Sequence, residues 1–383
     1  MKISNRALSG PASGIRHMFE LARNYENVIN LCIGEPGFGT PSNIIESACE
    51  ALHQGHTKYT SNAGVLELRQ ALTKKLAEDN RIFVDPLKNI VVTTGAGEAL
   101  MLSMLTLVNA GDEVIIPDPC WPNYYGHIGI AEGVAVPARS YEKDGFALTA
   151  EAIEKVITDK TKVLIINSPS NPTGAVIEED ELLKIGGLAK KHDFMIVSDE
   201  PYEKLIYDGN EHFSLGSVEE FKDYVITVNS FSKTYSMTGW RVGYAVGPES
   251  VIQPMVKLQE NLSSCVNSAA QQACIEALSG PQSAVDEMVA EYKNRRDLLV
   301  NGINELPGFS CMAPKGAFYA FVNIQGLGVD SARAAEQILE EIQVVTTPGS
   351  AFGKAGEGYL RISFASSTED IEEALKRLKK HFI

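Results

Sequence analysis

The chain is short of positive charge, with 34 Lys and Arg residues against 49 Asp and Glu residues. The formal net charge of -15 argues against a nucleic-acid partner, because such binding depends largely on Lys and Arg displacing counterions from phosphates. A local group of Arg side chains and backbone N–H groups can still hold a small anion against the overall field. We therefore expect a small-molecule ligand.

The sequence also lacks long apolar runs and paired cysteines. No stretch reaches the ~20 apolar residues that span a bilayer, and no apolar signal segment follows the first residues. The six cysteines are scattered, without a Cys-x-x-Cys pair or a His at metal-ligand spacing. We expect no membrane span, no metal site, buried free thiols and a cytoplasmic location.

What the sequence does contain is an alternation of short β-branched runs and longer helical stretches between residues 45 and 280. Such alternation is typical of an α/β fold around a mostly parallel sheet. Most runs are continuously apolar, as strands covered on both faces should be. The predicted strands cover residues 90–94, 113–117, 163–167, 195–198, 225–229 and 241–246.

A change of composition after Gly280-Pro281 indicates a domain boundary. A long charged helix is predicted over residues 282–305, with further helices over 331–341 and 369–380 and strands over 318–322 and 360–364. The 383 residues suit two domains. The second is expected to be smaller and of mixed α+β type.

The polar residues that follow the apolar runs deserve inspection, because ligands of open α/β sheets bind at the carboxyl ends of the strands. The most specific of these ends reads Asn229-Ser-Phe-Ser-Lys233-Thr-Tyr-Ser-Met-Thr-Gly-Trp-Arg241. A lone lysine at a strand end is usually a solvated charge. Here a primary amine, several hydroxyls and a guanidinium follow one buried strand.

This segment resembles the cofactor-lysine signature of the class I aminotransferases, the aspartate aminotransferase-like group of pyridoxal-phosphate enzymes of fold type I. The resemblance extends from Gly34-Glu-Pro-Gly-Phe-Gly-Thr-Pro41 to Tyr359-Leu-Arg361-Ile-Ser-Phe364, in the family's order. It implies a sheet of the seven-stranded type in a large domain of residues 46–281. A small domain would comprise residues 1–45 and 282–383, and Lys233 would bind the aldehyde of pyridoxal 5'-phosphate.

The resemblance also implies how the cofactor phosphate is held. Ser230, Ser232 and Arg241 would bind it, together with the backbone N–H groups of Ala96 and Gly97 at a helix N-terminus. Taken singly, the serines and glycines could be turn residues and Arg241 could form a surface ion pair. Gly97 is informative in another way, because some aspartate-selective relatives carry a lysine there.

The cofactor ring has its own expected contacts. Asp199 would keep the pyridine nitrogen protonated, although a strand-end Asp often only caps a turn. Asn171 and Tyr202 resemble the pair that bonds the phenolic oxygen, but Asn-Pro-Thr-Gly174 is also an ordinary turn sequence. Trp121 would lie against the ring, and an aromatic between two prolines could equally be core.

The substrate contacts complete the resemblance. Arg361 would bind the α-carboxylate bidentately, helped by Gly34, Trp121 and Asn171, unless it is an exposed strand residue. Tyr59 resembles the tyrosine that reaches the cofactor phosphate of the neighbouring subunit. A homodimer is therefore expected.

The function that follows is transamination between an L-amino acid, with aspartate or aromatic donors expected first, and a 2-oxo acid such as 2-oxoglutarate. Lys233 would move the substrate α-proton. One alternative is a β-lyase or synthase that eliminates a side-chain substituent. A second is a noncatalytic cofactor-binding sensor, which is less expected because the chain has no basic segment for DNA binding.

Overall fold

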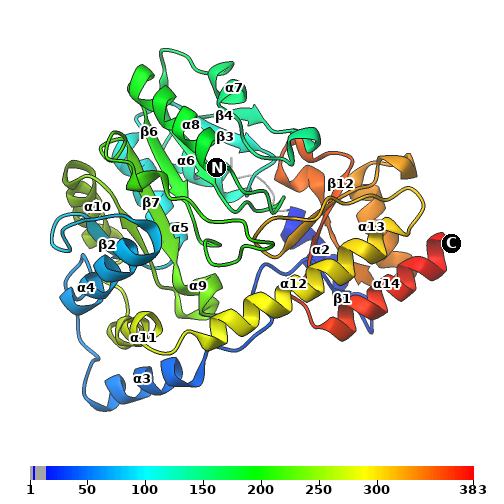
Figure 1. Cartoon of the computed structure of the whole chain (residues 1–383), viewed down its shortest axis with the longest axis horizontal. Coiled ribbons are helices and arrows are strands. Elements are labelled where there is room, and N and C mark those ends of the chain that lie inside the picture. The colour runs from blue at the N-terminus through cyan, green and yellow to red at the C-terminus, as the bar shows by residue number, and fades with distance from the viewer. Residues whose placement is uncertain (1–2, 5–13) are drawn as a thin grey trace.

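A computed structural model describes residues 3–4 and 14–383 of the chain (Figure 1). Its largest sheet has seven strands in the order β2-β8-β7-β6-β5-β3-β4. All neighbours are parallel except β8, which runs antiparallel to both β2 and β7. The strands are β2 (Ile90–Thr93), β3 (Glu113–Asp118), β4 (Val134–Arg139), β5 (Thr161–Asn167), β6 (Met195–Asp199), β7 (Val225–Ser230) and β8 (Gly243–Val246).

The prediction of an α/β fold with a mostly parallel, seven-stranded sheet is confirmed. Two details differ. Strand β4 was not predicted, because it is an edge strand with a partly exposed burial pattern and an internal Pro137, so that it has no continuous apolar run. The strand predicted from residue 241 begins at Gly243, because Arg241 has a left-handed backbone (φ 57°) at the end of a short 3₁₀ turn.

Helices cover both faces of this sheet, so successive strand residues enter different cores. Ile116, Ile165 and Val197 pack with α5 (Ala96–Leu107) and α10 (Glu249–Leu262). Their neighbours Ile115, Leu164 and Ile196 pack against α8 (Glu179–His192) on the other face. The period of two along each strand explains why the strands read as continuous apolar runs. The remaining helices around this sheet are α3 (Ser42–His53), α4 (Leu66–Lys75), α6 (Asn123–Ile130), α7 (Ala150–Glu154), α9 (Phe231–Thr234) and α11 (Ser268–Ser279).

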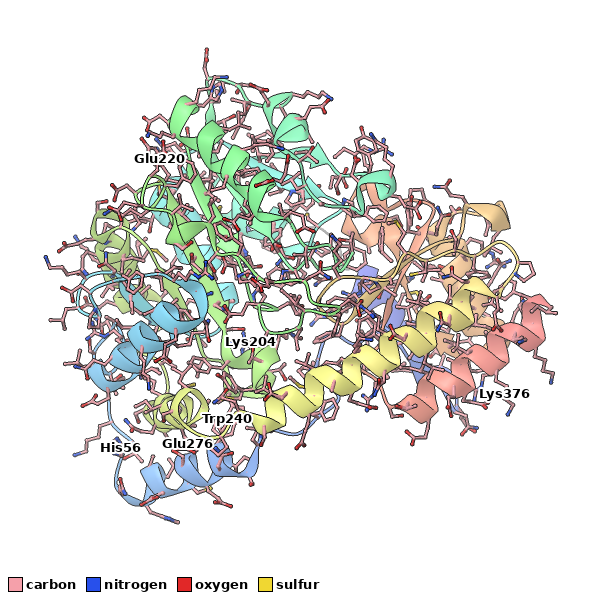
Figure 2. The ribbon with its side chains drawn as sticks, in the orientation of Figure 1. His56, Lys204, Glu220, Trp240, Glu276 and Lys376 are labelled. Carbon is pink, nitrogen blue, oxygen red and sulfur yellow. The ribbon has the colours of Figure 1, made fainter. Side chains whose placement is uncertain are left out.

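Helices α3 and α11 lie together at one end of the molecule (Figure 2). Asn43 of α3 donates a hydrogen bond of 2.8 Å to Glu276 of α11. Both helices share an apolar cluster with α4 and strand β2. Residues 42–53 are therefore anchored to the large sheet.

A second set of elements brings the two ends of the described chain together. Strand β1 (Ile29–Asn30) pairs in parallel with β10 (Val344–Val345), and β9 (Tyr319–Asn323), β11 (Thr347–Pro348) and β12 (Tyr359–Ser363) form an antiparallel sheet. A single apolar core joins them to their helices. These are α2 (Gly14–Ala22), α12 (Ser283–Asn304), α13 (Ser331–Ile342) and α14 (Thr368–Phe382).

Two helices of this second set, α13 and α14, begin at side chains that cap them. Asp330 accepts a hydrogen bond from the backbone N–H of Arg333 (2.8 Å) at the start of α13, and Ser367 accepts one from Asp370 (3.1 Å) at the start of α14. The predicted helices and strands of this region are observed within about one to two residues of their expected ends. The division into domains of residues 46–281 and the remainder stays a prediction.

Among the described residues, no helix is both long enough and apolar enough to cross a membrane. The six cysteines all carry free thiols.

Candidate active site

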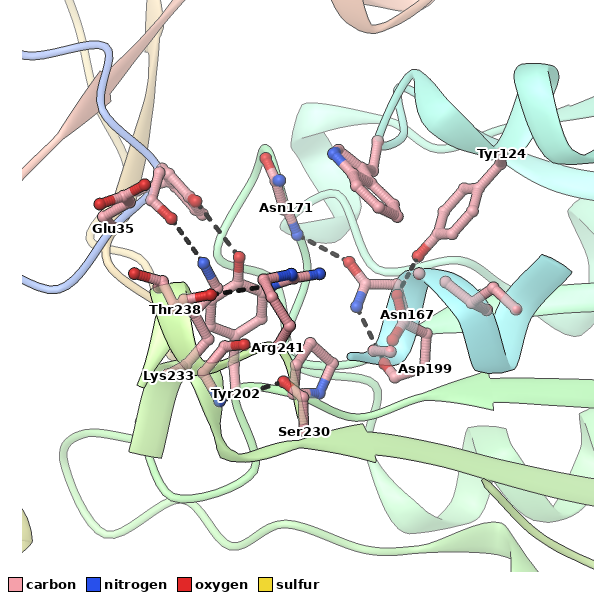
Figure 3. A pocket seen from close by; sticks show the side chains of 18 of the residues that line it. Glu35, Tyr124, Asn167, Asn171, Asp199, Tyr202, Ser230, Lys233, Thr238 and Arg241 are labelled. Carbon is pink, nitrogen blue, oxygen red and sulfur yellow. Dashed lines mark hydrogen bonds between the residues drawn. The ribbon is translucent and has the colours of Figure 1, made fainter. Parts of the chain in front are cut away.

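A cavity of about 590 Å³ opens at the carboxyl ends of strands β5, β6 and β7 (Figure 3). Of the thirteen residues predicted to form the site, twelve line it: Gly34, Ala96, Gly97, Trp121, Asn171, Asp199, Tyr202, Ser230, Ser232, Lys233, Arg241 and Arg361. They come from both sets of elements. The chain therefore assembles the predicted chemistry in one place.

Lys233 lies in α9, directly after β7. Its Nζ donates a hydrogen bond of 2.5 Å to the carbonyl oxygen of Gly34. Burial lowers the pKa of Lys233 to about 8; Arg361 and Arg241 act in the same direction, while Glu35 opposes them. A lysine with this pKa is neutral in about a tenth of molecules at pH 7, against less than about 0.1% for an ordinary lysine. A neutral amine is the form that attacks an aldehyde.

Asp199 ends β6 with a carboxylate that is only 4% exposed. Its Oδ2 accepts a hydrogen bond of 2.6 Å from the hydroxyl of Tyr124, whereas Oδ1 is buried without a partner. Burial raises the pKa of Asp199 to about 7, with Glu200 adding to the rise while Tyr124 and Lys233 oppose it. Oδ1 of Asp199 therefore lacks the hydrogen-bond donor that a buried oxygen normally has, and an N–H group of a ligand can supply it.

A second part of the cavity is suited to an anion. Helix α5 begins there with the backbone N–H groups of Ala96 and Gly97, and Ser230, Ser232 and Arg241 line the same cavity. Gly95, with φ 78°, precedes the helix, and a Cβ at that position would lie 2.5 Å from Nη2 of Arg241. The absence of a side chain at Gly95 allows the guanidinium to approach the helix N-terminus. Thr238, which the sequence did not single out, accepts a hydrogen bond of 2.9 Å from Nη1 of Arg241.

Arg361 on β12 is only 2% exposed, and its guanidinium lies 4.4 Å from the ring centre of Tyr319 and 4.8 Å from that of Phe352. It donates hydrogen bonds to Oδ1 of Asn171 (3.0 Å) and to the carbonyl oxygen of Cys32 (2.7 Å), while its Nε has no partner. No carboxylate within the described residues pairs with it. A buried cation without an anion is costly, so this group is prepared for an anionic ligand.

Several cavity residues were missed by sequence reasoning. Tyr124 reaches Asp199 from α6, Asn167 accepts the backbone N–H of Asn171 (2.8 Å) and donates to the carbonyl of Asp199 (2.9 Å), and Tyr319 meets Tyr202 with 3.2 Å between the hydroxyls. Asn167 stands at a polar strand end, so its position was a usable signal. Tyr124 and Tyr319 read as ordinary core aromatics, and the sequence held no signal for them.

Trp121 and Tyr59, both predicted to contact the cofactor, differ in whether they reach the cavity. Trp121 lines the cavity with its ring packed edge-on against Tyr124, at 5.5 Å between ring centres. Tyr59 does not line it: its side chain is 90% exposed, on the loop before α4. A single chain therefore does not bring Tyr59 to the site.

Residues 26–378 match the family model described as aminotransferase class I and II. The chain belongs to this family of transaminases. It is 42% identical to aromatic-amino-acid aminotransferase 2 of Thermococcus litoralis over 99% of this chain and 98% of the relative. It is 43% identical to an aspartate aminotransferase of Pyrococcus abyssi over the same shares of the two chains.

Solved structures agree with the family assignment. The aspartate aminotransferase from Thermus thermophilus with maleate superimposes with a TM-score of 0.94 at 37% identity, over 99% of both chains. An aromatic aminotransferase from Pyrococcus horikoshii OT3 gives a TM-score of 0.91 at 43% identity, over 96% of this chain and 98% of the other. The resemblance noted in the sequence is thus confirmed.

Class I aminotransferases of the aspartate aminotransferase type use pyridoxal phosphate, and this is the cofactor of the chain. The cavity fits it. Asp199 has an unpartnered buried oxygen for a ring N–H, and the start of α5 beside Arg241 forms a cradle for a phosphate dianion. Lys233 has the lowered pKa that an aldehyde-binding amine needs.

Proposed function

We propose that this aminotransferase exchanges an amino group between an L-amino acid, aspartate or an aromatic amino acid, and a 2-oxo acid such as 2-oxoglutarate. The observation that carries the proposal is the unpaired, buried guanidinium of Arg361 in the same cavity as Lys233. Every α-amino acid and every 2-oxo acid offers a carboxylate next to its reacting carbon. One guanidinium can bind that carboxylate in both halves of the reaction.

The chemistry requires a proton to move from the substrate α-carbon. When bound, the cofactor supplies a ring that accepts the electron pair left behind. We assign the proton transfer to Lys233, which combines reach with a lowered pKa. Asp199 would hold the ring nitrogen in its protonated form, and Trp121 would lie against the ring.

The remaining residues would bind and orient. Ser230, Ser232, Arg241 and the N–H groups of Ala96 and Gly97 would hold the phosphate, while Asn171 and Tyr202 would bond the phenolic oxygen. Arg361 would fix the substrate carboxylate, with Gly34 beside it. Because Asn171 already contacts Arg361, the carboxylate and the reacting carbon would be oriented by one connected group.

The charged residues that line the cavity bear on which amino-donor side chain the enzyme accepts. The cations lining the cavity are Lys233, Arg241 and Arg361, each with a role already assigned. Position 97, where a lysine would meet a second carboxylate, is a glycine, and a Cβ there would meet open space. The relatives carry both aspartate and aromatic names. Both donor classes therefore belong in the first screen.

The proposed function is tested by incubating the enzyme and pyridoxal phosphate with single amino acids and 2-oxoglutarate. Glutamate and the donor's own oxo acid should form in equal amounts. A cysteine conjugate without any acceptor tests the alternative: continuous release of pyruvate and ammonia would identify a β-lyase. Absence of turnover with every donor would favour a cofactor-binding sensor.

A homodimer with Tyr59 contributed across the interface is part of the proposal. Its support is the exposure of this aromatic side chain on a loop that does not reach the cavity of its own chain. A cytoplasmic location is proposed as well, in keeping with the six free thiols.

We expect Tyr59→Phe to raise the dissociation constant of pyridoxal phosphate by roughly 10- to 100-fold, because a hydrogen bond to a charged group contributes about 1.5–3 kcal/mol. Equilibrium titration of the apoenzyme measures it, and sedimentation at the same concentration reports the dimer. Tyr141→Phe, at another exposed tyrosine, is the control. Equal affinity in both variants would remove Tyr59 from the site.

A further inference from the structure

The turn that carries Asp199 and Tyr202 has a second, buried face. Asp199 and Tyr202 line the cavity, whereas the intervening Glu200 and the following Glu203 do not. Both glutamates are nevertheless buried, with exposed fractions of 1% and 8%. Glutamate is rarely buried to this degree unless its charge is paired, so the partners of these carboxylates need an explanation.

Glu200 accepts three hydrogen bonds from side chains. Its Oε1 accepts one from Ser198 Oγ at 2.6 Å, and its Oε2 accepts one from Ser214 Oγ at 2.6 Å. His212 Nε2 lies 2.8 Å from the same Oε2. Burial alone would lower the pKa of His212, but Glu200 and Glu203 outweigh burial and raise it. The imidazole is therefore held toward its charged form beside Glu200.

Glu203 belongs to the same network. Its Oε1 pairs with the ammonium of Lys75, and its Oε2 accepts a hydrogen bond of 2.7 Å from Asn80, which also donates to Ser214 (2.8 Å). We call this group the Glu200 cluster: Lys75, Asn80, Ser198, Glu200, Glu203, His212 and Ser214. The carboxylates and the imidazole come within 4.8 Å of one another, as in a metal site, but Lys75 already supplies the positive charge there.

The Glu200 cluster connects separate parts of the fold to the Asp199 turn. Lys75 ends α4, Asn80 ends a π-helical turn (Leu76–Asn80), and Ser198 lies in β6. π-helical turns are rare and concentrate at functional sites. Buried ion pairs often add little to stability compared with apolar packing. A role in fixing the geometry of the adjacent site accounts for the π-helical turn and for the buried ion pair between Lys75 and Glu203.

The charges around Asp199 support the same role for Glu200. Burial is the largest cause of the raised pKa of Asp199, and the Glu200 carboxylate next to it raises that pKa further. The other charged or titratable groups that face Asp199 are Tyr124 from α6, Lys233 from α9 and Tyr202 from the same turn. Glu200 is the anion among these neighbours.

We propose that Glu200 is a positioning residue of this aminotransferase, whose fixed carboxylate holds the Asp199–Tyr202 turn and strengthens the attraction of Asp199 for the protonated ring nitrogen of the cofactor. The inference rests on the proposed role of Asp199. It adds a residue that touches neither cofactor nor substrate. Its action is electrostatic as well as geometric, so it has a signature that a purely structural residue lacks.

Glu200→Gln tests the proposal, because the amide keeps the size of the side chain and removes its charge. We expect the dissociation constant of pyridoxal phosphate to rise roughly tenfold, the lower end of the loss seen when a residue that orients a metal ligand is changed. The midpoint of the pH titration of the bound cofactor's absorbance should move to lower pH, because removing a nearby anion lowers the pKa of every protonated nitrogen of the bound cofactor. The affinity titration uses apoenzyme and free pyridoxal phosphate.

Two further variants make the result decisive. His381→Gln breaks another His–Glu pair, 3.1 Å long, with Glu341, and should change neither quantity. Ser214→Ala removes one donor to Glu200 but keeps its charge, so it should weaken cofactor binding without moving the pH midpoint. This variant carries the test if Glu200→Gln does not fold, and unchanged affinity in it would then overturn the proposal.

The possible failures can be told apart. If the parent enzyme does not bind pyridoxal phosphate, the proposed function fails. If the parent binds it and Glu200→Gln matches the parent in affinity and in pH midpoint, only the role of Glu200 fails. A lower thermal unfolding temperature with both quantities unchanged would mark Glu200 as merely structural.

Discussion

Lys233→Ala is expected to lower kcat/KM for transamination by roughly 10⁴-fold or more, since it removes both the amine that holds the cofactor and the group that moves the proton. Borohydride reduction should link the cofactor covalently to the parent enzyme and not to the variant, and mass spectrometry detects the added mass. Initial rates with 2-oxoglutarate give the size of the loss. A variant that turns over at the parent rate would refute the central assignment.

The control for this variant is Lys376→Ala on α14, where the lysine is solvent-exposed and pairs with Glu373 on the same helix (Figure 2). It should keep the parent rate.

The lowered pKa of Lys233 adds a pH test on the parent apoenzyme. Capture of pyridoxal phosphate should accelerate as the pH rises toward about 8, the pKa of Lys233, and level off above it, because the neutral amine is the reactive form.

Arg361→Lys is expected to lower kcat/KM for the amino donor by roughly 10²- to 10³-fold, mainly through KM. Lysine keeps the charge but loses the planar pair of donors that matches a carboxylate, so the loss should fall within the about 2–5 kcal/mol that full truncation of a buried charge partner costs. The 2-oxo acid acceptor should suffer a similar rise in KM, because the same guanidinium would bind its carboxylate. Steady-state kinetics with each substrate varied in turn measures both.

Arg296→Lys is the matched control, because Arg296 is also buried, lies 5.0 Å from the ring centre of Tyr207 and bonds Asp208 and Asp297 outside the cavity. It should affect stability more than either KM. Cofactor affinity should stay unchanged in Arg361→Lys. Parent-like KM values in Arg361→Lys would assign the carboxylate to another residue.

Sequence reasoning succeeded where one physical constraint dominated. The central strands are buried on both faces, so their apolar runs were visible, and the residues directly after them entered the cavity as expected. Asp199 and Lys233 are of this kind, each adjacent to the end of a buried strand. Arg361 lies between Leu360 and Ile362 of the core, and the alternation along the strand turns it to the cavity instead.

What could not be predicted depends on contacts between distant segments. Tyr124 bonds Asp199 across 75 residues of sequence, and Glu203 meets Lys75 across 128. Nothing in the local pattern of either pair specifies its partner. The edge strand β4 was missed for a different reason, because its partial exposure leaves no continuous apolar run.

The contact between Arg361 and the carbonyl of Cys32 spans 329 residues of the chain. Ribosomes add roughly 5–20 residues per second, so the two halves of this contact are synthesised roughly 15 to 65 seconds apart. During that interval Gly34 and Cys32 have no β12 to meet, whereas all strands of the large sheet are synthesised before the interval ends. The side of the cavity that is proposed to bind the substrate is therefore among the last parts to form, and a nascent chain that still lacks β12 has no Arg361 to offer a carboxylate.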